Sequence, residues 1–208
     1  MNIKFLFIVG TPPRDVLEMQ QIWRPQSKGY GSIIADNAFE PRDVLMHPNA
    51  TAYKLRTTIT GHGQEGEFIP QNHTINIDGG SVDYTWQVWT ECAENPIFPQ
   101  GGTWIYDRAG WCPGMETKRF DNNISAYVAA GQTAEFDVNW ESYNYNGGAG
   151  FDPEYIIEAT IFQYGDWNYA NDVAIHDVLS PSSKDQYWDK NPVCNNPEIV
   201  LANTGSEA

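Results

Sequence analysis

Short stretches of alternating apolar and polar residues, separated by turns containing glycine and proline, recur through this chain. In the clearest stretch, residues 52–60, Tyr53, Leu55, Thr57 and Ile59 share one face, and cationic or hydroxylated side chains occupy the other. This two-residue period is that of a half-buried β-strand. Further strand-like runs lie at residues 73–77, 84–89, 125–128, 134–143 and 155–164, and only residues 15–21 show a weak helical period. The pattern predicts an all-β fold, an antiparallel β-sandwich of the jelly-roll type.

The composition limits the kinds of molecule that this chain is expected to bind. The chain carries 12 Lys and Arg against 27 Asp and Glu, a formal net charge of −15. This charge argues against binding to DNA, RNA or an anionic membrane, since all three attract basic patches. No apolar run approaches the ~20 residues that a membrane-spanning helix needs. Aromatic residues make up 13% of the chain, which is typical of a globular protein because disordered chains are poor in them.

The charge is unevenly distributed and suggests three segments. Residues 1–50 hold five acidic and five basic residues, residues 51–165 hold fifteen and five, and residues 166–208 hold seven and two. The apolar run at 5–9 is too short for a secretory signal and ends in Gly-Thr-Pro-Pro at 10–13, which indicates a strand entering a turn. We expect residues 51–165 to form the main domain, and the polar residues 166–208 to begin as an extended strap.

Cysteine and histidine spacing predicts no metal site and no cofactor. The four histidines form no His-x-His pair, and none lies near a cysteine at metal-ligand spacing. Cys92 and Cys112 bracket a loop rich in aromatic residues, Gly and Pro, so they form either a disulfide or two buried thiols. Cys194 is then left over for a partner outside this chain. His62, between two glycines at a strand end, is either a functional residue or a solvated loop histidine.

Two motifs connect the chain to a known family. The first is Tyr-Lys-Leu-Arg-Thr-Thr-Ile-Thr-Gly-His-Gly at 53–63, followed by Glu67 and by His-Thr-Ile at 73–75. The second is Cys-Ala-Glu-Asn-Pro-Ile at 92–97, followed by Asp-Arg-Ala-Gly-Trp-Cys-Pro-Gly-Met at 107–115. This pattern is dense from residue 52 to 115 and looser from 8 to about 164. It resembles the C-terminal domain of peptide-N-glycosidase F, the bacterial amidase that removes N-glycans from asparagine.

The resemblance implies two antiparallel jelly rolls packed side by side, an arrangement shared with the copper-dependent peptidylglycine hydroxylases. This chain would supply the second roll. Residues 3–9 would be the last strand of the preceding roll, and residues 10–50 the connector between the two. Residues 197–206 resemble the first strand and turn of an immunoglobulin-like module of the CARDB kind, so we expect a further domain to begin there.

The resemblance also assigns candidate catalytic residues. Hydrolysis of a glycosylated asparagine amide needs a base that activates water, and carboxylates held in a cleft can provide it. In the family the principal acidic residue comes from the first roll and a supporting glutamate from the second. Glu67 matches that glutamate, and Arg108 matches the interface arginine that holds it. The family encloses the glutamate in a small Cys-x-x-x-Cys ring, whose two positions are Glu65 and Ile69 here, so we expect a more loosely held carboxylate.

Four further residues are candidates for substrate binding. Trp111 and Trp104 would offer flat apolar faces, to which the C–H face of a sugar binds. Phe68 replaces the tryptophan that follows the family's glutamate, and His62 replaces the tryptophan of a Gly-Trp-Gly at the preceding strand end. These two replacements lie at the candidate site itself.

The predicted function is therefore that of one part of an enzyme. The chain is expected to be the C-terminal domain of a secreted, cell-surface or periplasmic bacterial amidase that hydrolyses the Asn–GlcNAc amide of N-glycoproteins. Because the principal acidic residue belongs to the preceding jelly roll, the chain alone should be inactive. The alternative is a non-catalytic module that binds glycans or proteins, which the missing cysteine ring favours. A copper monooxygenase has only the fold resemblance in its favour.

Overall fold

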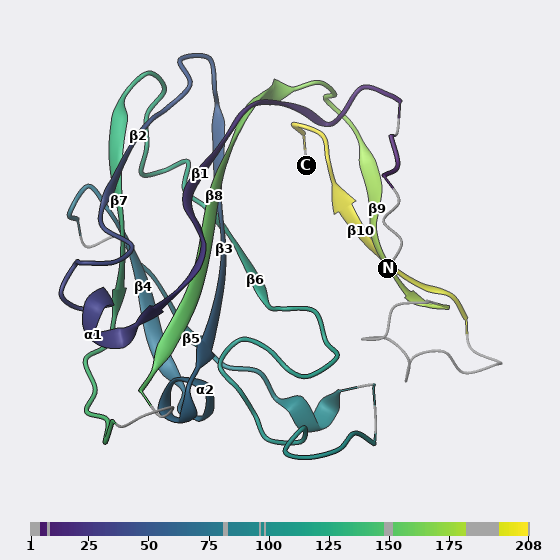
Figure 1. The fold of residues 1–208 in the computed structure, drawn as a ribbon. Coiled ribbons are helices and arrows are strands. Elements are labelled where there is room, and N and C mark those ends of the chain that lie inside the picture. The colour runs from purple at the N-terminus through teal and green to yellow at the C-terminus, as the bar shows by residue number, and fades with distance from the viewer. Residues whose placement is uncertain are drawn as a thin grey trace.

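Two antiparallel sheets of four strands each pack face to face within the part of the chain that the structure describes (Figure 1). This structure is a computed structural model, and it describes residues 5–7, 9–80, 83–95, 97, 99–147, 152–181 and 196–207. The first sheet has the order β1-β8-β3-β6 and the second β2-β7-β4-β5. The first contains β1 (Arg14–Gly29), β8 (Glu154–Trp167), β3 (Ala52–His62) and β6 (Arg119–Asn123). The second contains β2 (Arg42–Leu45), β7 (Thr133–Trp140), β4 (Gln71–Ile77) and β5 (Asp83–Val88). The predicted all-β, antiparallel sandwich is confirmed.

The alternation of apolar and polar residues at 52–60 agrees with which side chains of β3 are buried and which lie on the outer face. Tyr53, Leu55, Thr57 and Ile59 are buried, and the residues between them are half-buried on the outer face up to Thr58. Inward-facing residues of β8, β4 and β7 complete the same core: Tyr155, Ile157, Ala159, Ile161, Ile75, Ile77, Phe136 and Val138. The core thus lies between the sheets, and the outer face of the first sheet carries polar and aromatic side chains.

The structure differs from the prediction of a connector over residues 10–50. Residues 14–29 are strand β1, which pairs antiparallel along β8, and residues 42–45 are β2 at the edge of the second sheet. A four-residue helix, α1 (Tyr30–Ile33), lies between them. The pairing of β1 with β8 has four register shifts, and each such bulge interrupts the two-residue period by which a strand is recognised. Residues 5–7 and 9 are not in a strand, while the rest of the predicted strand 3–9 lies outside the described residues.

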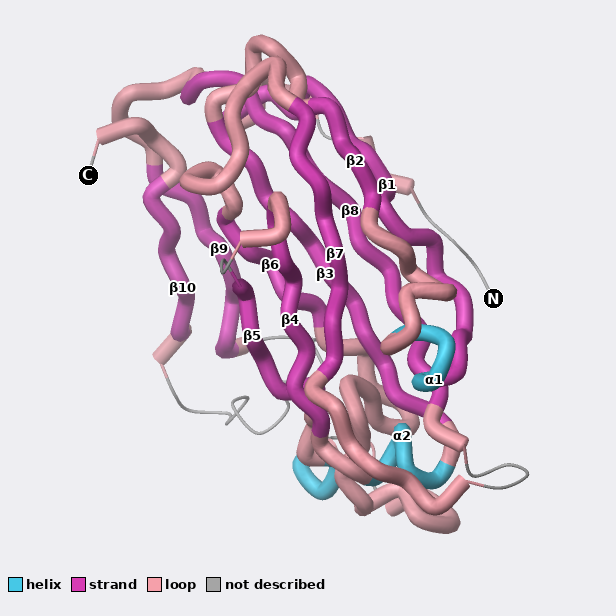
Figure 2. The backbone as a smooth tube through the Cα atoms, turned by 90° about the vertical axis from the view of Figure 1, so that its left-hand side faces the viewer, coloured by secondary structure: helices cyan, strands magenta, loops and turns pink. Residues whose placement is uncertain are grey.

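The C-terminal segment also contains more structure than a strap. Strands β9 (Val173–Ser180) and β10 (Glu198–Asn203) pair antiparallel as a two-stranded ribbon. The ribbon is a sheet of its own and lies apart from both four-stranded sheets (Figure 1), and Figure 2 shows the same strands in the view turned by 90°. Strand β10 falls inside the stretch that resembles the start of an immunoglobulin-like module, and whether a further domain begins there stays a prediction, as do the domain boundaries. Cys194 lies outside the described residues. Among the residues described, no helix has the length and apolar character needed to cross a membrane.

The burial of His73 leads to a prediction about how the stability of the fold depends on pH. Its ring lies in the core, 4.4 Å from the ring of Trp140, and burial lowers the pKa of His73 from 6.5 to about 3. Between these values the unfolded chain binds a proton that the folded chain does not, so stability falls as the pH falls. We expect a loss of roughly 1.4 kcal/mol for each pH unit below about 6.5 from this group. Denaturant unfolding at several pH values measures it. The slope should be shallower in His73→Gln and unchanged in His176→Gln, which alters an exposed residue of β9; equal slopes in all three proteins would contradict the assignment.

Candidate functional site

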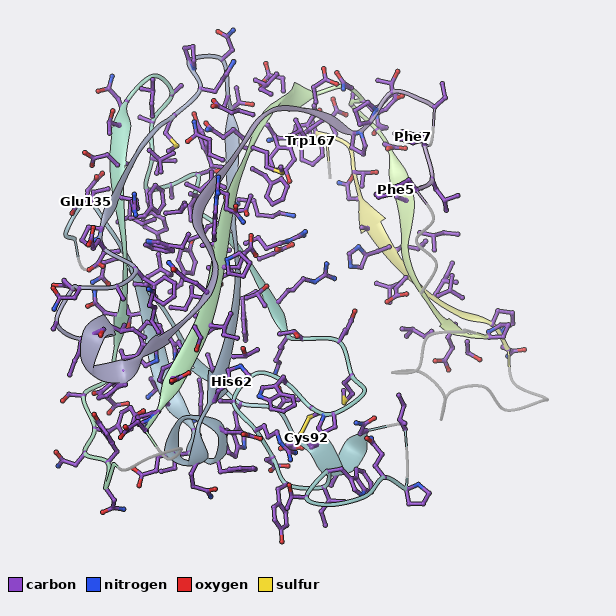
Figure 3. The ribbon with its side chains drawn as sticks, in the orientation of Figure 1. Phe5, Phe7, His62, Cys92, Glu135 and Trp167 are labelled. Atoms are coloured by element: carbon purple, nitrogen blue, oxygen red, sulfur yellow. A yellow bond between two sulfur atoms is a disulfide. The ribbon has the colours of Figure 1, made fainter. Side chains whose placement is uncertain are left out.

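A disulfide fixes the loop of residues 90–112 at one end of the sandwich. Cys92 and Cys112 are both buried, with a Cα–Cα distance of 5.4 Å, and of the two alternatives left open by the sequence the structure shows the disulfide (Figure 3). A crosslink over a loop of this length contributes about 3 kcal/mol in the chain-entropy model. The loop is also tied to itself by backbone hydrogen bonds in both directions between Thr90 and Arg108. The single turn η1 (Cys92–Glu94) begins the loop.

Helix α2 (Gln64–Phe68) follows β3 directly and packs against this loop. Gly61 makes the close approach possible, because a Cβ atom there would lie 2.0 Å from the carbonyl oxygen of Gly66. The backbone N–H of Gly61 donates to the carbonyl of Ala109, and the N–H of Ala109 donates to the carbonyl of Glu67, both at 2.9 Å. These bonds place α2 beside residues 108–109, and Figures 1 and 2 both show α2 and the loop at the same end of the sheets.

Glu67 and Arg108 form an ion pair at this junction. Arg108 Nε donates to Glu67 Oε1 at 2.6 Å, and the side chains are 5% exposed for Arg108 and 20% for Glu67. The other four N–H groups of the guanidinium donate to the carbonyl oxygens of Thr103, Trp104 and Tyr106 and to the hydroxyl of Thr103. All five donors of Arg108 are therefore used, which holds its planar fork in one orientation. Within the described residues, no hydrogen-bond donor contacts Glu67 Oε2.

Two aromatic side chains flank the guanidinium of Arg108, and a third stacks on one of them. The Arg108 Cζ lies 5.1 Å from the ring centroid of Phe68 and 5.2 Å from that of Trp111, within cation–π distance. His62 stacks on Trp111 with ring centroids 5.6 Å apart and an interplanar angle of 28°. Trp111 Nε1 donates to the carbonyl of Gly61 at 3.1 Å, which fixes the indole. The order of the stack is Phe68, Arg108, Trp111, His62.

Two hollows open beside the stack. One of about 620 Å³ is lined by Phe68, Trp89 and Tyr106, among others. The other, of about 330 Å³, is lined by His62, Trp111 and Glu158. Burial lowers the pKa of His62, while the nearby carboxylates of Glu67 and Glu154 oppose that shift. His62 is thus part of a cavity wall and not a fully solvated loop residue.

The structure links five of the six predicted site residues in one series of contacts, in which Arg108 touches Glu67, Phe68 and Trp111, and Trp111 touches His62. Trp104 is half-buried, and the contact it makes with the others is its backbone carbonyl oxygen, which accepts from Arg108 at 3.4 Å. The sequence did not indicate Thr103 and Tyr106, because they hold Arg108 mainly through backbone carbonyls, which carry no sequence signal; Thr103 adds its hydroxyl. Glu65 was indicated only as a departure from the family. The carboxylate of Glu65 accepts hydrogen bonds from the backbone and side-chain amides of Asn146, and these anchor α2 to the loop after β7.

The structure differs from the expectation that the Glu67 carboxylate is loosely held. Although Glu65 and Ile69 cannot close a cysteine ring, the Arg108 guanidinium fixes one oxygen of Glu67 and the backbone bonds to Gly63 and Ala109 fix its main chain. The described residues contain no group of three or more His, Cys, Asp and Glu side chains able to hold a metal ion.

Comparisons with known proteins match this domain. The family model described as "Peptide-N-glycosidase F, C terminal" matches residues 29–149, more than half of the chain. The chain belongs to this family. The resemblance seen in the motifs is therefore confirmed, and all six predicted site residues lie in the matched stretch.

Individual relatives in the peptide-N-glycosidase F family are longer than the part of them that this chain matches. It is 31% identical over 132 residues to peptide-N(4)-(N-acetyl-beta-D-glucosaminyl)asparagine amidase F of Elizabethkingia miricola, which covers 58% of this chain and 36% of that protein. It is 26% identical to PNGase F, a glycosylasparaginase from Flavobacterium meningosepticum, with a TM-score of 0.59 over 76% of this chain and 55% of that one. A second amidase structure is 28% identical, with a TM-score of 0.54 over 60% of this chain and 43% of that one. The chain thus spans between about a third and just over half of these relatives.

Proposed function

We propose that this chain is the C-terminal part of an N-glycan amidase and that Glu67 is the carboxylate it contributes to the reaction. The observation that supports this most directly is the state of that carboxylate. One oxygen is fixed by a guanidinium whose five donors are all used, while the other has no donor from the described residues and the side chain remains 20% exposed. A partly exposed carboxylate with a fixed orientation is suited to binding a reacting group or a water molecule.

The remaining chemistry requires a second acidic group. In hydrolysis of a glycosylated asparagine, water attacks the amide carbon, and the glycosylamine nitrogen leaves with a proton. A carboxylate that activates the water would come from a preceding jelly-roll domain of the same parent protein, facing Glu67 across an interdomain cleft. The relatives matched here are about two to three times as long as the part of them that this chain covers, which leaves room for such a domain.

The aromatic stack would hold the sugar. The exposed parts of Trp111 and His62 line one hollow and Phe68 lines the other, so a glycan placed over Glu67 would have apolar ring faces on both sides of Arg108. The substrate class that fits is an N-glycan or glycoprotein. The buried disulfide is typical of secreted, periplasmic or cell-surface proteins.

Turnover of a fluorescent N-glycopeptide tests the proposal. We expect no turnover by this chain alone, because one of the two acidic groups is missing, and turnover by a longer parent protein that includes the preceding domain. Release of the glycan by the isolated chain would contradict the need for that domain. A parent protein that is folded but inactive on several N-glycopeptides would contradict the amidase.

A non-catalytic glycan-binding module is the second candidate, because Phe68 and His62 replace two tryptophans of the family pattern. In that case the parent protein would bind glycans on an array with no cleavage, and Glu67→Gln would leave the binding unchanged. Binding that is lost in Trp111→Ala, together with the absence of turnover, would favour this candidate over the amidase.

A further inference from the structure

Another cavity lies at the far end of the first sheet from Glu67 and from the two hollows beside the stack. It has a volume of about 600 Å³ and is lined by one residue or more from each of the four strands: Arg14 of β1, Lys54 of β3, Asn123 of β6, and Tyr164 and Trp167 of β8. Strand β3 runs from this cavity at Ala52 to His62 at the candidate site, which corresponds to about 30 Å at the usual rise per residue. Figure 3 shows Trp167 and His62 at opposite ends of the sheet.

The charge of this cavity is opposite to that of the chain. Its lining includes the cations Arg14 and Lys54 and no carboxylate, in a protein with a net charge of −15. Three further cavities formed by described residues are each lined by at least one Asp or Glu. A cationic hollow in an acidic protein favours a ligand with a localised negative charge.

The Arg14 guanidinium has an unused hydrogen-bonding capacity. It lies 4.1 Å from the ring centroid of Trp167, its Nε is buried without a hydrogen-bond partner, and no described carboxylate pairs with it. A buried donor without a partner is costly. Lys54 is only partly neutralised, because the Asp121 oxygen 3.5 Å away is already bonded, with its other oxygen, to Arg56 at 2.7 and 2.8 Å. A carboxylate in the cavity would give this unpaired guanidinium of Arg14 an anionic partner.

The remaining lining suits a sugar ring. Trp167 is 39% exposed, and Tyr164 of the same strand also lines the cavity, so both offer apolar ring surface to a C–H face. Asn123 and Thr51 offer an amide and a hydroxyl to sugar hydroxyl groups. A polyanion such as nucleic acid is disfavoured, because the net charge of the chain would repel its other charges.

We propose that this cavity binds an acidic sugar, a glycosyl residue that carries one carboxylate, such as a sialic or uronic acid at a chain end. Arg14 pairs with the carboxylate, Lys54 adds to the positive field, and Trp167 and Tyr164 contact the ring. This binding does not depend on the proposed amidase activity, because the cavity and Glu67 lie at opposite ends of the sheet.

Calorimetric titration of the chain with sialyllactose tests the proposal, with lactose as the neutral match and glucuronic acid against glucose as a second pair. We expect the acidic member of at least one pair to bind about tenfold tighter or more, which is the order of effect of one charge-assisted hydrogen bond. Arg14→Gln and Trp167→Ala should each weaken this binding about tenfold or more. The matched control Arg42→Gln, at an exposed position of the second sheet, should not.

Three results would overturn the proposal. These are equal affinity for acidic and neutral sugars, no binding of any of them at millimolar concentration, and full competition by inorganic sulfate, which would indicate a general anion site. Thermal unfolding of each variant shows whether it is folded. Should Arg14→Gln be unfolded, Lys54→Gln replaces it, and in that variant unchanged affinity for sialyllactose would count against the site.

Discussion

Replacing Glu67 with Gln in a parent protein that includes the proposed preceding domain is expected to lower kcat on an N-glycopeptide by about 10²-fold or more. The substitution keeps the size of the side chain and an oxygen that can accept from Arg108 Nε, which the carboxylate does now at 2.6 Å. It removes the negative charge that would bind the reacting group. Because the sugar would be held by the aromatic rings around Arg108, we expect KM to change much less than kcat.

The matched control for this experiment is Glu135→Gln. Glu135 is exposed on β7 of the second sheet, on the opposite side of the molecule from the stack (Figure 3), so its replacement should leave kcat unchanged. Equal rates for wild type and Glu67→Gln would remove Glu67 from the mechanism. A rate that falls together with the thermal stability would show that Glu67 acts on the fold instead.

Replacing Arg108 with Met in this chain is expected to lower the free energy of unfolding by about 3–5 kcal/mol. The guanidinium is 5% exposed and makes five hydrogen bonds, four of which satisfy groups of the loop at residues 103–106. Removing it leaves those carbonyls and the Glu67 carboxylate without partners, and unpaired buried acceptors are costly. Denaturant unfolding followed by tryptophan fluorescence measures the change.

Arg56→Met is the control for Arg108→Met. Arg56 pairs with both oxygens of Asp121, at 2.7 and 2.8 Å, but the two side chains are about one-third exposed, so the loss should be below about 1 kcal/mol. Adding Glu67→Gln to Arg108→Met should recover part of the stability, because it removes the unpaired charge. Equal losses for Arg108→Met and Arg56→Met would contradict the role given to burial.

The two ends of the first sheet carry two different proposed sites. At one end the ion pair of Glu67 and Arg108 lies among aromatic rings, and at the other Arg14 lies over Trp167. The amidase role of Glu67 and the acidic-sugar site at Arg14 are separate proposals, so a result that contradicts one leaves the other standing. Loss of turnover in Glu67→Gln says nothing about acidic sugars, and loss of sialyllactose binding in Arg14→Gln says nothing about amide hydrolysis.

Local patterns in the sequence predicted the sandwich because the inward and outward alternation of a strand is a property of neighbouring residues. The alternation identified β3 and its buried face, including Leu55 and Ile59, and it marked residues 155–164 of β8 as a strand, whose buried residues Ile157 and Ile161 the structure then showed. It failed at β1, where four register shifts against β8 interrupt the alternation. The pairing of strands that are distant in sequence, such as β1 and β8, leaves no pattern among neighbouring residues from which it could be predicted.

The sites were decided by tertiary structure. The motif resemblance indicated Glu67 and Arg108, but these lie 41 residues apart, and their contact depends on Gly61 permitting α2 to approach the disulfide-bonded loop. The carbonyls that fix Arg108 belong to residues whose side chains play no part, apart from the hydroxyl of Thr103. Arg14 and Trp167 meet only because β1 and β8 pair along their length. Amino-acid order determines which residues are apolar and where strands alternate, whereas distances between remote side chains exist only after the sheets have packed.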